Sequence, residues 1–181
     1  MKKITLILTL LITAGSLFAQ KKITTSATVK FDASTSVDNM PKAENKTVIA
    51  SLNTTTGAIA IEAAVKNFTF SNPTMQGHFN GANWLDSDKF PTFGYKGMIT
   101  DLASVNFTKD GSYKVNTEGV LTVKGIEQKI IAPATLVIKG TSVSASANFS
   151  IKLSDYGITS SMIDGGKVAK EPKVSVAAEL K

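Results

Sequence analysis

The sequence predicts an all-β protein, most naturally an antiparallel barrel of about eight strands. Apolar and polar residues alternate along most of the chain, as in SVSASANFSIKL, where Val143, Ala145 and Phe149 face away from the serines between them. Alternation with one polar side is typical of antiparallel strands that are half buried on a core. Turn signals such as Asp110-Gly111 and Lys124-Gly125 separate the alternating runs.

Eight segments are predicted as strands, and short connections join most of them. They span residues 22–32, 46–54, 57–67, 91–101, 112–124, 127–139, 142–153 and 173–181. This order favours an up-and-down meander, and closing the meander into a barrel leaves no exposed strand edge. A two-sheet sandwich is the alternative, and the pattern alone separates the two poorly.

Two long segments, 71–90 and 154–172, interrupt the alternation. Connections of this length in compact domains are often functional lids or contain short helices. Asn72-Pro73 predicts the start of a helix over residues 74–85, which two glycines limit to two turns at most. The residues expected on one face of this helix are Met75, His78 and Phe79.

Residues 1–19 have the layout of a secretory signal peptide. Lys2 and Lys3 precede an apolar stretch, and small residues lead to a predicted cleavage after Ala19. The apolar stretch of about 14 residues is shorter than the roughly 20 that a spanning helix needs. We therefore expect a periplasmic or secreted protein without stable membrane insertion, in which residues 20–181 form a single domain.

Composition narrows the classes of function. The chain has no cysteine, which excludes disulfides and thiolate metal sites. Its formal charge of +6 falls to +4 without Lys2 and Lys3, and it comes entirely from lysines spread along the chain. Arginine, the side chain best suited to bidentate contacts with phosphate or guanine, is absent. Nucleic-acid binding is therefore not expected.

The only histidine and the only tryptophan, His78 and Trp84, lie close together in MQGHFNGANWLDSDKFP. A serine hydrolase needs an oriented base and a serine in a strained turn, and the chain has no G-x-S-x-G motif. A metal site needs three or four suitable ligands, and one imidazole with scattered aspartates does not provide them. We therefore expect no catalytic residues, no metal and no cofactor. His78 is interpreted as a wall residue or a ligand contact.

The interior of the predicted barrel decides between two kinds of protein. A barrel of about eight strands encloses a space that side chains can fill or that holds one small ligand. Small residues at inward positions leave room, and the chain has many of them. They are Ala27, Ala63, Ala132, Ala134, Ala145, Ala147 and Ala178. A filled core of phenylalanines and aliphatic residues and a cavity for an apolar chain are equally compatible with the composition.

Three stretches match the motifs of a known family. Residues 75–93 hold His78-Phe79, then Trp84-Leu85-Asp86, then Lys89-Phe90-Pro91-Thr92-Phe93 at the start of a strand. Further on, GVLTVKG leads into an apolar strand, and NFSIKLSDYGI ends in Ser-Asp-Tyr-Gly-Ile at residues 154–158. In this order and spacing, the sequence resembles the YceI-like family of exported, lipocalin-like proteins associated with polyisoprenoid binding.

The chain departs from the family pattern in two polar features. The family's common form carries Arg-Asp shortly before the histidine, where this chain has Met75, Gln76 and Gly77. The family's first strand often holds a second histidine, whereas FDAS here keeps only Asp32 and Ser34. If these groups orient a ligand head group in the family, this chain has lost them. The resemblance therefore supports the fold more strongly than a particular ligand.

The resemblance implies a lipocalin-like β-barrel with one or two short helices in the long loops. It also implies an isoprenoid lipid as the ligand, such as a quinone or polyprenyl lipid, held in the interior. Residues 75–91 then correspond to the roof of the cavity and the entry into a strand. The residues expected to line or border the site are Phe68, Phe70, His78, Phe79, Trp84, Phe93, Phe149 and Ile151.

Three hypotheses of function follow from these observations. The first is a non-catalytic exported module that binds an apolar chain. The second is a scaffold or interaction protein of the cell envelope with a filled barrel and an apolar outer patch. The third, an enzyme, needs polar groups that converge on His78. A homodimer is compatible with each of them, but no feature of the sequence specifies one.

Overall fold

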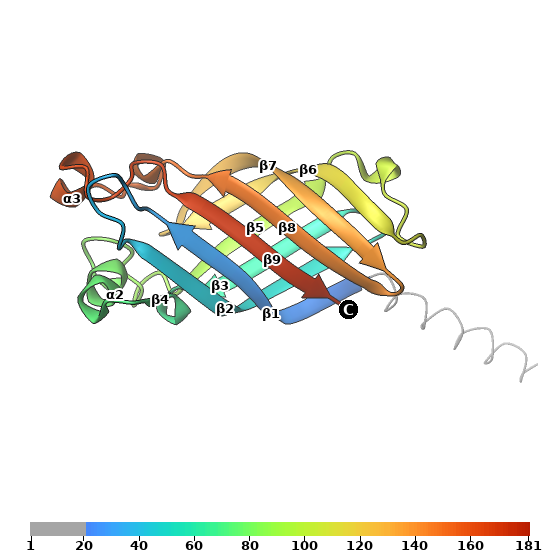
Figure 1. Ribbon diagram of the computed structural model, residues 1–181, viewed down its shortest axis with the longest axis horizontal. Helices are drawn as coiled ribbons and strands as arrows, with labels where there is room; N and C mark the ends of the chain where they lie inside the picture. The colour runs from blue at the N-terminus through green and yellow to red at the C-terminus, as the bar shows by residue number, and fades with distance from the viewer. Residues whose placement is uncertain (1–20) are drawn as a thin grey trace, which may run out of the picture.

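Eight antiparallel strands form a closed barrel in the computed structural model, which describes residues 21–181 (Figure 1). The predicted signal peptide, residues 1–19, lies outside the described residues. The barrel strands are β1 (Lys21–Asp32), β2 (Lys42–Asn53), β3 (Ala58–Ala64), β5 (Thr92–Ile99), β6 (Gly111–Val123), β7 (Ile126–Lys139), β8 (Ser142–Ser150) and β9 (Lys173–Leu180). Each of them was predicted within a few residues of its observed bounds, except for the beginning of β2.

Strand β1 closes the barrel because it pairs with both the second and the last strand. Its antiparallel partners are β2, from Lys21 opposite Asn53 to Asp32 opposite Lys42, and β9, from Thr28 opposite Ala177 onward. The remaining strands pair in chain order. This closure confirms the predicted barrel and decides against the two-sheet sandwich.

Strand β2 begins four residues earlier than predicted because a buried asparagine interrupts its apolar pattern. Asn45 is fully buried, donates to the Ala64 carbonyl over 3.0 Å and accepts from the Thr47 N–H over 2.8 Å. The β1–β2 register shifts at this point, between the pairs Ala27–Val48 and Val29–Asn45. A β-bulge here explains why simple alternation fails.

The connections at one end of the barrel contain short elements (Figure 1). They are the two-residue strand β4 (Thr69–Phe70), α2 (Pro73–Asn80), α3 (Ser161–Asp164) and 3-10 helices at Val65–Asn67 and Leu153–Tyr156; a third 3-10 helix, Leu102–Ser104, follows β5. The Asn72 side chain caps α2 by accepting from the Thr74 N–H over 2.8 Å. The helix ends before Gly81, so it is shorter than the predicted 74–85. None of the described helices is long and apolar enough to cross a membrane.

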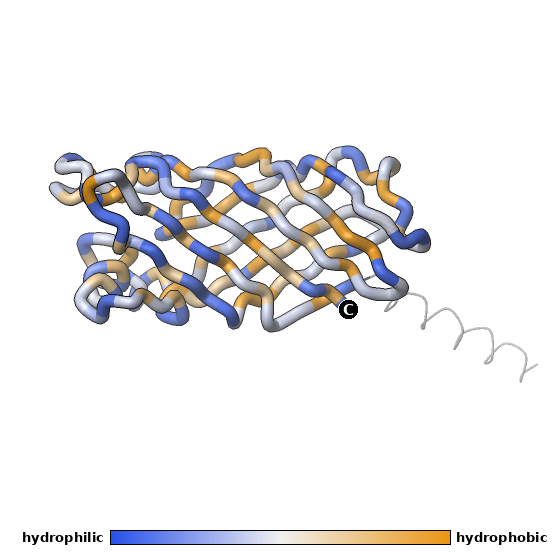
Figure 2. The backbone as a smooth tube through the Cα atoms, in the orientation of Figure 1, coloured by the Kyte–Doolittle hydropathy of each residue, from blue (hydrophilic) through white to orange (hydrophobic). Residues whose placement is uncertain are grey.

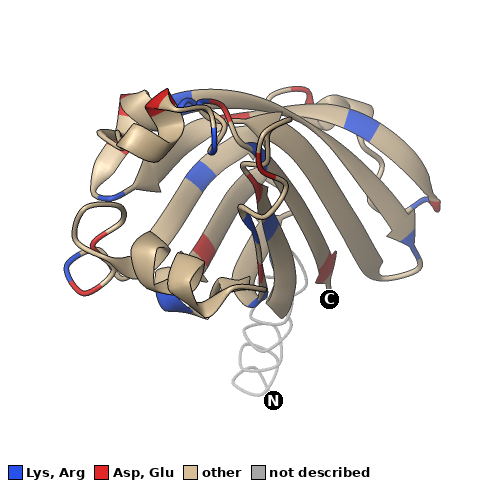
Figure 3. Cartoon of the chain, turned by 60° about the vertical axis from the view of Figure 1, so that its left-hand side comes forward, with Lys and Arg blue, Asp and Glu red and all other residues tan. Residues whose placement is uncertain are grey.

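Inward positions on the strands are mostly apolar and outward positions are mostly polar. Figure 2 shows this as repeated changes between hydrophobic and hydrophilic segments along each strand. Basic and acidic residues are scattered over the strands and loops without forming one block (Figure 3). The expected inward alanines are buried or line the interior, Ala27 among the former and Ala147 among the latter.

Tyr95 lies against two glycines that face each other across β5 and β6. Gly97 pairs with Gly119, and a Cβ atom on Gly97 would lie 2.5 Å from both the Tyr95 hydroxyl and the Glu118 carbonyl oxygen. The ring can follow the barrel wall only because these two positions lack a side chain.

Replacing Gly97 by valine therefore lowers the free energy of unfolding, by about 2–3 kcal/mol, as expected for overpacking against backbone. Gly94→Val on the same strand is the matched control, because nothing lies within 4 Å of its Cβ position. Urea unfolding of both variants measures the difference. Equal midpoints would show that the contact between Tyr95 and the glycines does not constrain the wall.

Candidate ligand-binding site

A large apolar cavity runs through the barrel. It encloses about 1430 Å³, including the open space at its mouth, and residues from all eight barrel strands line it. Along β6 the lining extends from Val115 to Val123, which corresponds to roughly 27 Å of extended strand. The scaffold hypothesis requires an interior filled by side chains, and this cavity argues against it.

Tyr95 and Thr117 are the polar side chains on inward positions among the described lining residues. Ser51 and Ser146 also border the cavity but occupy outward positions of their strands. The Tyr95 hydroxyl donates to the Thr117 hydroxyl over 3.1 Å, which in turn donates to the Ala132 carbonyl over 3.1 Å. Burial raises the pKa of Tyr95, and the pair remains neutral.

At the end away from α2, three leucine and isoleucine side chains of the lining are buried. Leu52, Ile99 and Leu180 line that end and are buried at 2%, 4% and 3% exposure. At the other end the lining includes Trp84, which is only partly buried. We therefore place the mouth of the cavity beside Trp84, at the end that carries α2 and α3 (Figure 1).

Helix α2 covers part of the mouth with a phenylalanine. Phe79 is buried, and its ring centroid lies 4.9 Å from that of Phe70 and 5.9 Å from those of Phe31 and Phe68. Phe93 joins the cluster through an edge contact with Phe68, with centroids 5.6 Å apart. Aromatic pairs at such distances contribute beyond their buried area.

Gln76 attaches the helix to the chain segment before it. Its side-chain amide donates to the Phe68 carbonyl over 2.5 Å and accepts from the Phe70 N–H over 3.1 Å. The amide thus pairs with the backbone on both sides of Thr69, as a neighbouring strand would. It occupies part of the stretch where the family pattern has Arg-Asp.

Gln76→Ala removes both hydrogen bonds and lowers the free energy of unfolding by about 1–3 kcal/mol, because each bond contributes about 0.5–1.5 kcal/mol. His78→Ala, on an exposed position of the same helix, serves as the control and changes little. Urea unfolding of the two variants measures both effects. A Gln76 variant as stable as the parent would show that the rings alone hold α2.

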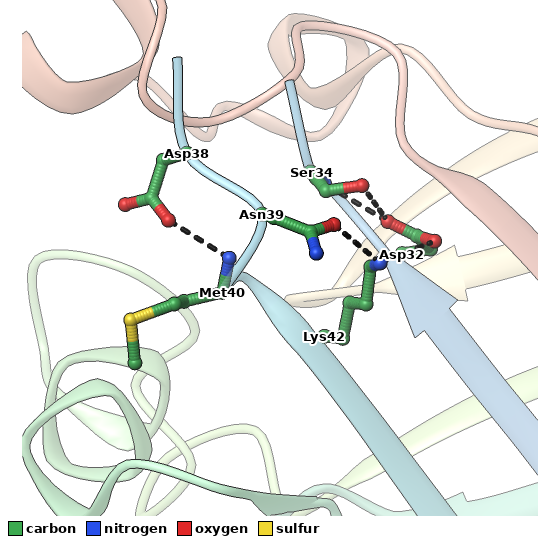
Figure 4. A network of polar contacts seen from close by, with 6 residues as sticks. All are labelled: Asp32, Ser34, Asp38, Asn39, Met40 and Lys42. Carbon is green, nitrogen blue, oxygen red and sulfur yellow. Dashed lines mark hydrogen bonds and ion pairs between the residues drawn. The ribbon is translucent and has the colours of Figure 1, made fainter. Parts of the chain in front are cut away.

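Polar residues form a network beside the mouth, where β1 ends and β2 begins (Figure 4). Asp32 accepts from the Ser34 N–H over 3.0 Å and from its hydroxyl over 2.5 Å, and the Lys42 ammonium lies 3.7 Å away. Burial opposes ionisation of Asp32. The Ser34 hydrogen bonds and the charges of Lys42 and Lys173 outweigh it and lower the pKa. The two polar residues kept from the family's first-strand motif therefore bind each other and Lys42.

Six of the eight predicted site residues line the cavity. They are Phe68, Phe79, Trp84, Phe93, Phe149 and Ile151. Phe70 does not line the cavity, and its ring packs against Phe79. His78 is exposed on α2 and is not among the residues that line the cavity. His78 and Phe79 were expected on one face of the helix. In the structure Phe79 is buried and His78 is exposed.

Sequence reasoning missed several lining residues. Tyr95 and Thr117 fall on inward positions of β5 and β6, and the period of two could have placed them there. Leu85 and Ile158 come from the long connections and had no such signal. Within the described part of the chain, no group of three or more His, Cys, Asp or Glu side chains could hold a metal ion.

Comparison with known proteins agrees with this geometry. The model of the YceI-like domain family matches residues 13–180, nearly the whole chain. The chain belongs to the YceI-like family. No curated protein matches the sequence. The identity of this YceI-like chain with solved structures is low, so these likenesses concern the fold.

Three solved structures share the YceI-like fold of the chain. A polyisoprenoid binding domain from Saccharophagus degradans, implicated in plant cell wall breakdown, has 9% identity and a TM-score of 0.75, covering 90% of this chain and 98% of that one. BcnA from Burkholderia cenocepacia has 17% identity and a TM-score of 0.66, covering 86% and 96%. The YceI protein of Campylobacter jejuni has 17% identity and a TM-score of 0.56, covering 78% and 81%.

Proposed function

We propose that this protein is an exported, non-catalytic carrier that holds one apolar chain of the isoprenoid type inside its barrel. A quinone or polyprenyl lipid would supply such a chain. The observation that carries the proposal is the cavity, which is apolar along the length of the barrel except for Tyr95 and Thr117. Such a lining favours a long hydrocarbon, because burying apolar surface drives its transfer from water.

Two further observations support the ligand class and the export. The domain from Saccharophagus degradans, which shares the fold, is a polyisoprenoid binding domain. Residues 1–19 have the layout of a secretory signal peptide, which would deliver the barrel to the periplasm or the medium.

The chemistry of the lining supports binding without catalysis. General acid–base or nucleophilic catalysis needs activated groups within hydrogen-bond reach of the reacting atoms. The inward polar groups are the hydroxyls of Tyr95 and Thr117, which are paired with each other. The single imidazole, His78, lies outside the cavity.

Native mass spectrometry tests the proposal directly. The full chain is expressed with its own leader and a C-terminal tag. The tag is placed there because Lys181, whose N–H donates to the Ile23 carbonyl, lies at the end away from α2. The expected result is a stoichiometric extra mass that extracts as an isoprenoid lipid. Trp84, the single tryptophan, then reports rebinding of that lipid to stripped protein through its fluorescence.

The proposal falls if the protein carries no extra mass and neither quinones nor polyprenyl lipids alter its mass or its Trp84 fluorescence. A straight-chain fatty acid as the bound species would retain the carrier function and overturn the isoprenoid class.

A further inference from the structure

Three exposed apolar side chains lie on the β1–β2 loop and on α3, at the end of the barrel that carries the mouth. Val37 and Met40, 69% and 47% exposed, lie on the loop between β1 and β2, and Met162, 41% exposed, lies on α3. The two segments are hydrogen-bonded to each other. The Thr35 hydroxyl donates to the Gly166 carbonyl over 2.7 Å, and the Ala169 N–H donates to the Ala33 carbonyl over 2.8 Å. We call these three side chains the apolar rim.

The loop that carries the rim is held in a defined shape. The Thr35 hydroxyl accepts from the N–H groups of Val37 and Asp38, each over 3.1 Å. The Asp38 carboxylate accepts from the Met40 N–H over 2.8 Å (Figure 4). Figure 2 shows a hydrophobic segment at the outer tip of this loop. These bonds keep Val37 and Met40 exposed in an ordered turn.

The charges near the rim do not form a patch of one sign. Lys167 and Lys170 of the α3–β9 connection are balanced by Asp164 and Glu171. Asp38 adds one negative charge on the other loop. A partner of this face is therefore recognised by apolar contact rather than by charge.

We propose that the apolar rim docks on the surface of a lipid bilayer, so that the mouth faces the membrane and the apolar chain passes between bilayer and barrel. This inference rests on the proposed function. A stable dimer interface buries about 800 Å² on each partner, far more than three side chains supply. A bilayer surface accepts isolated apolar side chains without a complementary shape. Direct transfer also spares a long hydrocarbon a passage through water.

The experiment compares two triple variants of the full mature chain. Val37→Ser/Met40→Ser/Met162→Ser removes the rim. Met98→Ser/Ile131→Ser/Val137→Ser is the matched control, because these side chains are exposed at 52%, 70% and 44% on the barrel wall. Co-sedimentation is measured with phosphatidylcholine vesicles and with vesicles that contain phosphatidylglycerol. Lipid loading of each protein is followed separately by native mass spectrometry.

We expect the rim variant to bind vesicles about tenfold more weakly than the parent and the control to bind as the parent does. Binding should be insensitive to salt and to phosphatidylglycerol, because the charges near the rim are balanced. A parent that loads lipid but binds neither vesicle overturns the docking and leaves the proposed function standing. Rim-dependent vesicle binding by a protein that never loads lipid supports the docking and overturns the proposed function.

Two other outcomes also overturn the docking. In one, the control variant loses vesicle binding as strongly as the rim variant. In the other, the parent is a dimer that the rim variant converts to a monomer, which would make the rim a contact between copies of the chain.

Discussion

The double substitution Ala134→Phe/Ala147→Phe is expected to abolish lipid binding while the barrel stays folded. Ala134 on β7 and Ala147 on β8 are paired neighbours, and both line the cavity. Two rings at this level would block the cavity across its width. We expect affinity for the bound lipid to fall by about 100-fold or more, because a chain could no longer extend past the rings. Titration of the stripped variant, followed by Trp84 fluorescence, measures this loss.

The stability of the Ala134→Phe/Ala147→Phe variant tests the cavity without any ligand. In an empty interior, each ring gains about 1.5–3 kcal/mol from burial, which keeps the variant at least as stable as the parent. In a filled interior, the same rings overpack the core and lower the free energy of unfolding by about 1–3 kcal/mol. The sign of the change therefore separates a carrier from a filled scaffold.

Ala60→Phe/Ala177→Phe provides the matched control, because both alanines are exposed on the outside of the barrel. It should retain lipid binding. A cavity variant that still binds the lipid with the affinity of the parent would contradict the placement of the site inside the barrel.

The strands could be predicted from the sequence because their signal is local. Each inward side chain has an outward neighbour in contact with water, so the period of two appears in runs such as Val143 to Leu153. Closure into a barrel was the favoured arrangement, but it depends on the pairing of β1 with β9, far apart in the chain. Apart from the pattern of strands, only the family resemblance favoured a closed barrel.

The parts that could not be predicted depend on contacts between distant segments. The start of β2 was missed because the buried Asn45 is satisfied by Ala64, which no local pattern indicates. Strand β4 has two residues, too short for a period to be recognised. His78 was assigned to the site on the family resemblance, yet in the fold it is exposed while its neighbour Phe79 is buried.

The interior itself was predicted only in part. The inward alanines indicated free space, but whether the eight phenylalanines that follow the predicted signal peptide fill it depends on where they lie. In the structure Phe31, Phe68, Phe70 and Phe93 gather with Phe79 of α2 in one cluster of rings, and inward alanines such as Ala134 and Ala147 line the cavity. This gathering of the rings in one place depends on the tertiary fold.

Removing the ring of Phe79, which lies at the centre of the aromatic cluster at the mouth, is expected to lower stability and to speed lipid release. Phe79→Ala leaves the rings of Phe31, Phe68 and Phe70 without their common partner. Truncating a buried phenylalanine lowers the free energy of unfolding by about 3–5 kcal/mol. Since Phe79 joins α2 to the barrel, we expect the loss to loosen the helix first and to speed release of the bound lipid by roughly tenfold or more.

Two measurements separate loosening of the mouth from general destabilisation. Urea unfolding gives the change in stability, and the decay of Trp84 fluorescence after mixing loaded protein with excess vesicles gives the rate of release. Phe107→Ala is the matched control, because Phe107 is partly buried against the core in the connection between β5 and β6, at the end away from α2. It should lower stability and leave the rate of release unchanged. Equal acceleration by both variants would mean that the lipid leaves through unfolding of the whole barrel and that α2 does not control the mouth.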